Sequence, residues 1–271
     1  MSKQTSQGTA LITGASSGIG AVYADRLARR GYDLILVARN RARLEGLAER
    51  LLHETGRRVD VLAADLTVPI DLRRVEEALR SEPSITMLVN NAGIGATASL
   101  IESDPDHLET MIRLNVIALT RLTRAAAPAF VARGRGTVIN IASIVALSPE
   151  LLNGSYSGSK AYVVNFSQSL HHELADKGVR VQAVLPGAIR TEFWDTAGLP
   201  VSHLPQEIVM TADDLVDAAL AGLDAQELIT IPSLPNVGDW QRFDAARLDM
   251  APNLSRAQPA ERYAAMQATT A

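Results

Sequence analysis

Short apolar runs alternate with helix-like periodicities along most of the chain. Seven runs have the length and composition of buried strands, at residues 9–13, 33–38, 58–63, 86–89, 136–141, 179–185 and 228–231. Apolar residues at three- and four-residue spacing between them predict helices, at residues 18–30, 41–53, a stretch through Leu79, 104–132, 153–177 and 211–225. Strands that alternate with helices favour parallel βαβ units, so we expect an α/β fold with a doubly wound, seven-stranded parallel sheet.

The alternation continues without a linker, which predicts a single domain over residues 1–271. Residues 188–210 interrupt the regular pattern, yet they carry an apolar set that an idle surface loop would lack, namely Phe193, Trp194, Leu199, Val201 and Leu204. We interpret this stretch as a substrate lid. Residues 232–271 follow the last predicted strand as a C-terminal tail.

Composition narrows the class of protein. Hydrophobic residues make up 47% of the chain and charged residues 21%, as in a globular protein, and the net charge of −4 gives no electrostatic reason to expect a nucleic-acid partner. The absence of cysteine excludes disulfides and thiolate nucleophiles and agrees with a reducing compartment. With no long apolar run and a short polar N-terminus, we expect no membrane anchor or signal peptide and a cytoplasmic location.

A glycine-rich turn joins the first predicted strand to the first predicted helix. Its residues are Gly14, Ala15, Ser16, Ser17, Gly18, Ile19 and Gly20. Glycines permit a sharp bend, and backbone N–H groups at a helix N-terminus can approach a pyrophosphate. Such a turn is weak evidence by itself, but its position between a first strand and a helix is typical of a dinucleotide site.

Arg39 follows the second predicted strand, where the ribose of a bound adenine nucleotide would lie. A carboxylate there would accept hydrogen bonds from the ribose hydroxyls, whereas a guanidinium suits a 2′-phosphate. We therefore predict NADP(H) rather than NAD(H). Arg41 and Arg43 could share the role, and the alternative is that Arg39 only solvates the loop.

Two more loops follow predicted strands at the same edge of the sheet. Asp65 and Leu66 follow the third strand, and Asp65 would either touch the adenine or cap a turn. Asn91, Ala92 and Gly93 follow the fourth strand, and such short polar and small residues suit a tight loop beside a ligand. The asparagines alone would indicate only a turn.

Tyr156 and Lys160 are four residues apart on a predicted helix, so both side chains lie on one face. A free phenol titrates near pH ~10, and a fixed positive charge would let Tyr156 exchange a proton more easily. Lys160 is placed to supply that charge, although such a pair is also common without a function. Ser143 puts a hydroxyl at the carboxyl end of the fifth strand. Asn115, inside an apolar stretch, either satisfies backbone groups at a local distortion or holds an ordered water in a proton path.

Six features occur in register over most of the chain. They are Thr13-Gly14-x-x-x-Gly18-Ile19-Gly20, Asn90-Asn91-Ala92-Gly93, Asn115, Ser143, Tyr156-x-x-x-Lys160 and Pro186-Gly187-x-x-x-Thr191. Together they resemble the short-chain dehydrogenase/reductase family. The resemblance implies a single-domain Rossmann fold and hydride transfer between a nicotinamide and a carbonyl or alcohol.

The resemblance also implies residue roles. Tyr156 is then the general acid/base, and Ser143 hydrogen-bonds the substrate carbonyl. Lys160 lowers the pKa of Tyr156 and holds the nicotinamide ribose, while Asn115 positions a water. The residues expected to bind the cofactor are Gly14, Ser16, Ser17, Gly18, Ile19, Gly20, Arg39, Asp65, Leu66, Asn91, Ala92, Gly93, Tyr156, Lys160, Pro186, Gly187, Ile189 and Thr191.

The chain departs from the family pattern at two positions, and other activities remain possible. Gly158 stands where the family often has Ala, and Ala146 stands where Gly is frequent, which could shape the pocket floor. The five histidines show no zinc-type spacing, so no metal is expected. A regulator that senses NADP(H) without turnover is the alternative from another class, and a sugar-nucleotide epimerase would require a longer substrate domain.

The apolar lid favours an uncharged, mainly hydrophobic ketone or aldehyde, because burying an unpaired charge there would be costly. Arg190 could instead pair with a keto acid or an acyl thioester phosphate, or point outward to solvent. The helices at residues 104–132 and 153–177 carry apolar residues on more than one face, which predicts pairing into a homodimer or homotetramer. Those residues are Leu114, Ile117, Leu119, Leu122, Val163, Val164, Phe166 and Leu170.

Overall fold

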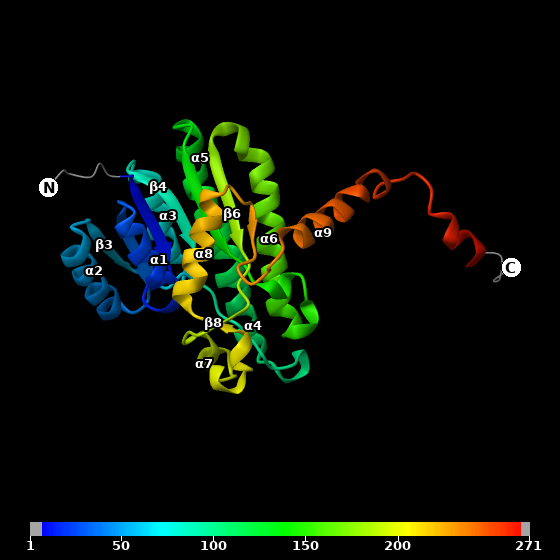
Figure 1. The fold of residues 1–271 in the computed structure, drawn as a ribbon, viewed down its shortest axis with the longest axis horizontal. Helices are drawn as coiled ribbons and strands as arrows, with labels where there is room; N and C mark the ends of the chain where they lie inside the picture. Colours follow the sequence, from blue (N-terminus) through cyan, green and yellow to red (C-terminus); the bar gives the residue numbers. More distant parts are fainter. Residues whose placement is uncertain (1–6, 267–271) are drawn as a thin grey trace. The chain divides into compact units, whose positions relative to one another are not determined.

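The computed structural model describes residues 7–266, without the side chains of residues 195, 196 and 264–266. Seven parallel strands form one sheet in the order β3-β2-β1-β4-β5-β6-β9 (Figure 1). Their bounds are β1 Thr9–Thr13, β2 Asp33–Ala38, β3 Val59–Ala63, β4 Ile85–Asn90, β5 Gly136–Ile141, β6 Val179–Val184 and β9 Ile229–Thr230. The predicted seven-stranded, doubly wound Rossmann sheet is confirmed.

Helices cover both faces of this sheet (Figure 1). Helices α1 (Gly18–Arg29), α2 (Arg41–Thr55) and α8 (Ala212–Asp224) bury apolar residues in one core. Helices α3 (Pro69–Ser81), α5 (Leu119–Ala132) and α6 (Gly154–Leu174) bury theirs in the other. Successive side chains along a strand point to opposite faces of the sheet, which explains why the apolar residues divide between two cores.

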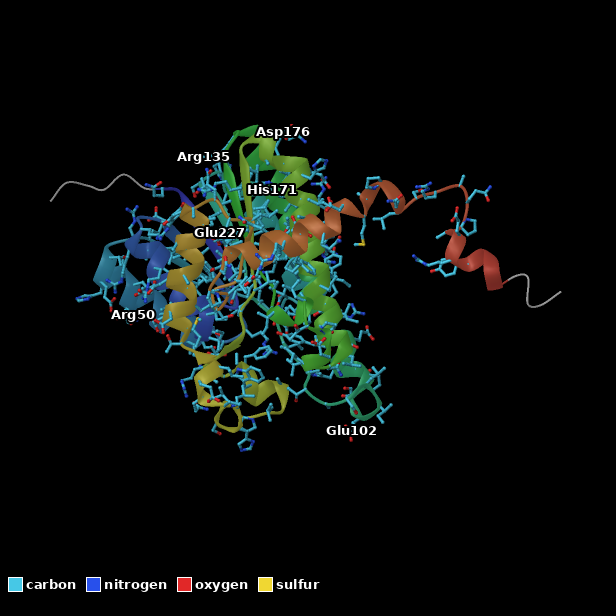
Figure 2. All side chains as sticks on the ribbon, turned by 45° about the vertical axis from the view of Figure 1, so that its right-hand side comes forward. Arg50, Glu102, Arg135, His171, Asp176 and Glu227 are labelled. Carbon is cyan, nitrogen blue, oxygen red and sulfur yellow. The ribbon has the colours of Figure 1, made fainter. Side chains whose placement is uncertain are left out.

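Strand β1 illustrates this alternation. Ala10 and Ile12 contribute to the first core, and Leu11 between them contributes to the second. A parallel sheet buried on both faces therefore appears in the sequence as a continuous apolar run. Charged side chains such as Arg50, Arg135 and Asp176 are exposed on the outside (Figure 2).

The helix predicted over residues 104–132 is three segments. Helix α4 (Pro105–Ile112) runs into a π-helical segment, Arg113–Ala118, and continues as α5. The predicted long helix is therefore present but is not α-helical throughout, and at its π-helical segment the amide of Asn115 bonds the backbone of Ile94. Its Oδ1 accepts from the Ile94 N–H at 3.1 Å, and its Nδ2 donates to the Ile94 carbonyl at 2.9 Å. The structure therefore contains a local distortion of the helix at Asn115, which was one of the two alternatives considered for this residue.

Residues 188–210 are more ordered than their sequence suggests. Strand β7 (Ala188–Ile189) pairs in parallel with β8 (Val209–Met210), so the two ends of the stretch are joined. Between them lies the short helix α7 (Phe193–Ala197). The predicted lid is thus a loop with paired ends, which limits how far its middle can move.

Most of the apolar residues on which the prediction of pairing rests are inside the fold. Leu119, Leu122, Val163, Val164 and Leu170 are buried, and Ile117, at 43% exposed, is the outward residue among the eight. The apolar pattern is explained mainly by packing against the sheet.

The described chain forms two compact units. The first ends at Ser233 and contains both sheets, and the second begins at Leu234. The second unit holds α9 (Val237–Asp249), in which the rings of Trp240 and Phe243 pack with centroids 5.5 Å apart. Within the described residues, no helix is long and apolar enough to cross a membrane.

Candidate active site

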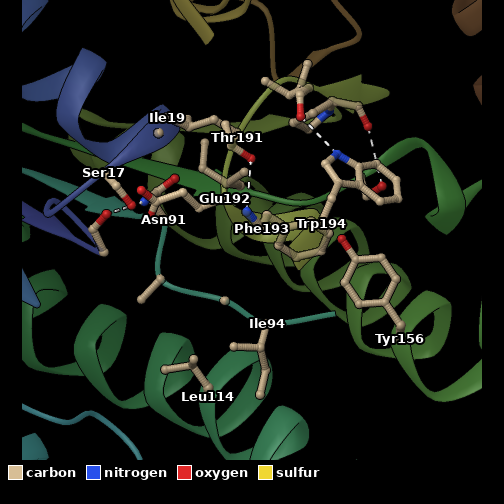
Figure 3. A pocket seen from close by; sticks show the side chains of 18 of the residues that line it. Ser17, Ile19, Asn91, Ile94, Leu114, Tyr156, Thr191, Glu192, Phe193 and Trp194 are labelled. Carbon is tan, nitrogen blue, oxygen red and sulfur yellow. Dashed lines mark hydrogen bonds between the residues drawn. The ribbon is translucent and has the colours of Figure 1, made fainter. Parts of the chain in front are cut away.

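A cavity of about 830 Å³ opens at the carboxyl edge of the sheet (Figure 3). The predicted site residues that line it are Gly14, Ser16, Ser17, Gly18, Ile19, Arg39, Asp65, Leu66, Asn91, Ala92, Gly93, Ser143, Tyr156, Lys160, Pro186, Gly187, Ile189 and Thr191. Gly20 and Asn115 are outside the lining. The structure therefore brings residues from the whole first unit to one place, where the strand order reverses between β1 and β4.

The glycine-rich turn is fixed by the conformation of its glycines and by hydrogen bonds from Asn91. Gly14 and Gly18 have φ values of +66° and +54°, which only glycine adopts without strain. A Cβ on Gly20 would lie 2.3 Å from the Gly14 carbonyl oxygen, so this position admits no side chain. Asn91 donates from Nδ2 to the carbonyl oxygens of Thr13 at 2.9 Å and Gly14 at 3.2 Å. Asn91 thus holds the turn in place as well as facing the cavity.

Thr13 completes this support, and the sequence argument assigned it no role of its own. Its Oγ1 accepts hydrogen bonds from the N–H groups of Asn91 and Ala92, both at 3.0 Å. The loop after β4 and the turn after β1 are therefore one rigid unit. The sequence feature that could have identified Thr13 was its position at the end of the first strand, directly before the glycine-rich turn.

The start of α1 fits an anionic group. Ser17 is the N-cap and makes no side-chain cap bond, and the first turn carries no acidic residue. Its backbone N–H groups have no partner within the helix, and the helix dipole adds a partial positive charge there. The hydroxyls of Ser16 and Ser17 line the same part of the cavity. These residues suit the pyrophosphate of a dinucleotide.

The three arginines at the start of α2 have different environments. Arg39 lines the cavity, is exposed, and makes no ion pair with any residue that the structure describes. Arg43 also lines the cavity, but its Nη1 is 2.6 Å from Oε2 of Glu192 in the lid. Arg41 pairs with Glu45 and is not part of the lining. Arg39 is therefore the cation most available to a phosphate.

Asp65 caps a turn, which is the second of the two roles considered for it from the sequence. It also lines the cavity. Its Oδ1 accepts from the Thr67 N–H at 2.9 Å and the Thr67 hydroxyl at 2.6 Å. This is the turn cap that short acidic side chains commonly make.

Tyr156 and Lys160 are buried side by side on α6. The Lys160 ammonium lies 5.8 Å from the centre of the Tyr156 ring, and its Nζ donates to the Ile141 carbonyl at 2.9 Å. Burial lowers the pKa of Lys160 to about 8. Burial also raises the pKa of Tyr156 to about 12, against a smaller lowering by a hydrogen bond with Ser143. The desolvation of the phenolate is the larger of these two effects, and the role expected of Lys160 toward Tyr156 stays a prediction.

Ser143 lines the cavity and hydrogen-bonds Tyr156 there. Its Oγ is 3.4 Å from the Pro186 carbonyl oxygen and accepts from the Val145 N–H at 3.3 Å, both long for hydrogen bonds of a hydroxyl. Asn115 is more fully used, because its second amide proton goes to the Ser159 hydroxyl at 3.1 Å. Only a lone pair on Oδ1 is left on Asn115 for a water.

The other end of the cavity is apolar. Around Ser143 and Tyr156, the lining comes from Ile94, Val145, Leu151, Leu152, Phe193, Trp194, Leu199, Leu204 and Ile208. Val201, which the sequence placed in the lid wall, does not line it. Arg190 is exposed, donates to Oε1 of Gln206 at 2.8 Å, and is likewise outside the lining.

Asn153 positions the helix that carries Tyr156, a function the sequence argument did not assign. As the N-cap of α6, its Oδ1 accepts from the N–H groups of Ser155 at 2.8 Å and Tyr156 at 3.4 Å. Its Nδ2 donates to the Ala98 carbonyl at 2.7 Å. One buried amide thus fixes the start of α6 and ties it to the loop after β4.

Asn153→Ala is expected to lower the free energy of unfolding by about 1–2 kcal/mol, because the cap acceptor is lost and the Ala98 carbonyl loses the shorter of its two side-chain hydrogen bonds. Thermal unfolding followed by circular dichroism would show the loss as a decrease in Tm. Asn165→Ala is the matched control, since Asn165 is exposed in the middle of the same helix. Equal Tm values for the two variants would contradict the capping role.

Comparison with known proteins agrees with this fold. The sequence model of the family described as short chain dehydrogenase matches residues 8–199. A short-chain dehydrogenase from Sphingobium yanoikuyae, solved in complex with NADPH, is 49% identical with a TM-score of 0.92, covering 94% of this chain and 99% of that one. The chain belongs to the short-chain dehydrogenase/reductase family and is an oxidoreductase of that class.

Two further relatives have names that refer to a ketone and to a hydroxysteroid. The bulky-bulky ketone specific alcohol dehydrogenase from Comamonas testosteroni, in its orthorhombic crystal structure, is 45% identical with a TM-score of 0.88, covering 96% of this chain and 99% of that chain. Human 17-beta-hydroxysteroid dehydrogenase type 3 is 33% identical over 213 residues, which are 78% of this chain and 66% of that protein. The chain thus spans about two thirds of the length of this curated relative.

Proposed function

We propose that this protein is an NADP(H)-dependent carbonyl reductase, working as an alcohol dehydrogenase in reverse, whose preferred substrates are uncharged, mainly hydrophobic ketones or aldehydes. The observation that carries the proposal is the division of the cavity. One end offers the exposed guanidinium of Arg39 and the helix N-terminus at Ser17, and the other surrounds Ser143 and Tyr156 with apolar side chains.

The cofactor end supports NADP(H). The N–H groups at the start of α1 would hold the pyrophosphate, and Arg39 would pair with the 2′-phosphate. Lys160 would donate to the nicotinamide ribose, and Ile189 and Thr191 would hold the carboxamide. When bound, NADPH supplies the hydride for the reduction. The NADPH complex of the Sphingobium yanoikuyae relative agrees with this cofactor.

The proton comes from the chain itself. With a pKa raised to about 12, the Tyr156 phenol is protonated at neutral pH and so carries the proton that a developing alkoxide would take. The Ser143 hydroxyl would donate a hydrogen bond to the same oxygen. The Lys160 ammonium near the ring would steady the phenolate that remains, and Asn115 would hold a water through Oδ1.

The substrate end supports a neutral ketone. Apolar walls stabilise apolar ligands by about 25 cal/mol per Å² buried, whereas an unpaired carboxylate would lose its hydration. Arg190, the cation that could have paired with a keto acid or thioester phosphate, is engaged with Gln206 outside the lining. The ketone specificity of the Comamonas testosteroni relative points the same way.

The test is the loss of NADPH absorbance against neutral aryl and alkyl ketones, keto acids and acyl thioesters, with NADH in parallel. We expect the highest kcat/KM for neutral hydrophobic ketones with NADPH. Higher values for charged substrates, abolished by Arg190→Ala, would contradict the proposed substrate class. Tight NADPH binding without turnover of any carbonyl or alcohol would instead indicate a nucleotide-sensing regulator.

We further propose a cytoplasmic homodimer or homotetramer. The absence of cysteine is consistent with a reducing compartment. Exposed apolar residues on α4 and the π-helical segment, Ile112 and Ile117, each 43% exposed, support association. Light scattering at micromolar concentration would reveal a monomer if this is wrong.

A further inference from the structure

Phe193 lies where the lid meets the catalytic tyrosine. It is the first residue of α7, and its ring centroid is 5.9 Å from that of Tyr156, with the planes tilted by 44°. The Trp194 ring meets it edge-on, with centroids 5.6 Å apart. Figure 3 shows Phe193 and Trp194 on the side of the cavity to which Tyr156 points. The position of the Phe193 ring therefore determines how much space a substrate has beside the tyrosine.

Gly95, in the loop after β4, is shaped around this ring. A Cβ placed on Gly95 would lie 2.4 Å from Cζ of Phe193, and the next two contacts, at 3.1 and 3.2 Å, are with Cε2 and Cε1 of the same ring. Gly95 does not have a positive φ, so its backbone does not require glycine. What the missing side chain provides is a slot for the edge of the Phe193 ring, which we name the Gly95 slot.

Hydrogen bonds hold the two sides of the Gly95 slot, which are the loop after β4 and helix α7. The Thr97 hydroxyl, two residues beyond Gly95, donates to the Ala197 carbonyl of α7 at 2.6 Å. The buried Trp194 indole donates from Nε1 to the Ile189 carbonyl at 2.9 Å, which anchors the residue next to Phe193. The loop and α7 thus keep a fixed separation, and the ring has little freedom to adapt if the slot is filled.

We propose, building on the carbonyl reductase function above, that the Gly95 slot and the Phe193 ring together set the width of the substrate space. With its edge in the slot, the ring leaves space beside the Ser143 and Tyr156 hydroxyls, and a ketone with large groups on both sides of the carbonyl can enter. A side chain at position 95 would push the ring toward the Tyr156 hydroxyl and leave room only for narrow ketones.

Gly95→Ala tests the proposal with two substrates of different width. We expect kcat/KM for benzophenone, a diaryl ketone, to fall by about tenfold or more, and that for 2-butanone to change by less than about threefold. Gly46→Ala is the matched control, because Gly46 is exposed on α2 and a Cβ there would meet no other atom within 4 Å. An equal loss for both ketones, or no loss, would overturn the proposal.

Removal of the ring provides the second test. If the Gly95→Ala effect acts through Phe193, it should disappear in a Phe193→Ala background, so the two changes should be strongly non-additive. If Gly95→Ala alone does not fold, the double variant should fold and reduce benzophenone as Phe193→Ala does, since the clashing atoms are gone. A double variant that remains worse than Phe193→Ala, or that also fails to fold, would show that Gly95 acts independently of the ring.

Binding separates this proposal from the proposed function. In a Trp240→Phe background, Trp194 is the remaining tryptophan, and its quenching by benzophenone in the presence of NADP⁺ reports occupancy of the substrate end. We expect the dissociation constant to rise by about tenfold with Gly95→Ala. Binding with this dependence but no turnover would contradict the reductase function and leave the slot assignment standing. Unchanged binding in Gly95→Ala would overturn the slot assignment even if turnover is normal.

Discussion

Replacing Tyr156 with Phe is expected to lower kcat for ketone reduction by a factor of about 10² or more while NADPH still binds. Phenylalanine keeps the ring that packs against Phe193 and lacks only the O–H that would protonate the product alkoxide. Because the remaining cofactor-side residues are untouched, NADPH affinity measured by fluorescence titration should stay close to that of the unchanged protein. Steady-state rates with a neutral ketone give the loss in kcat.

Tyr162→Phe is the control for this substitution. Tyr162 is on the same helix, is 37% exposed, and shares a hydrogen bond of 2.7 Å with Thr120 outside the cavity. Its loss should leave kcat within about twofold, because a surface substitution away from the site has little effect. A Tyr156→Phe variant as active as Tyr162→Phe would show that another group supplies the proton.

The sheet was predictable because its strands are short, apolar and separated by strong turn signals. Strand β1 lies between the two cores, so every residue from Ala10 to Ile12 is buried and the apolar run has a clear length. The helix over residues 104–132 was harder to predict in detail. A π-helical turn contains one residue more than an α-helical turn, and this changes the spacing of the apolar residues too little to be visible in the sequence. Only the polar Asn115 inside the apolar stretch indicated the distortion.

The site was predictable where its residues occur in local patterns. The glycine turn, the Tyr156/Lys160 pair and Ser143 all follow strands or share a helical turn, so parallel topology alone brings them to one edge. Contacts between distant segments were not predictable. The fit between Gly95 and Phe193, and the ion pair between Arg43 and Glu192, depend on the path of the lid, which has no local signature.

The direction of the Tyr156 pKa was also beyond the sequence. A charge one helical turn away predicts a lowered value, but the effect of burial depends on which residues cover the phenol. Here the desolvation of the buried phenol outweighs the hydrogen bond with Ser143. With its pKa raised, the Tyr156 phenol keeps its proton at neutral pH.

Arg39→Asp is expected to have the second large effect, on the choice of cofactor. The exposed guanidinium of Arg39 would make charge-assisted hydrogen bonds to the 2′-phosphate, worth about 1.5–3 kcal/mol. Removing it should lower kcat/KM for NADPH by roughly 10- to 100-fold, since 1.36 kcal/mol corresponds to a factor of ten. The introduced carboxylate can accept from ribose hydroxyls, so kcat/KM with NADH should come closer to that with NADPH.

The neighbouring arginines make this prediction specific. Arg41→Asp changes the net charge by the same amount, but Arg41 is held by Glu45 outside the cavity lining, so it should lower kcat/KM for NADPH only slightly. Arg43→Ala should have an intermediate effect, because Arg43 faces the cavity while paired to Glu192. Steady-state kinetics of the three variants with both cofactors at fixed ionic strength would give this order. Equal losses of kcat/KM for NADPH in Arg39→Asp and Arg41→Asp would mean that the overall electrostatic field of the protein, and not a direct contact, attracts the phosphate. A preference of the unchanged protein for NADH would refute the assignment of NADP(H).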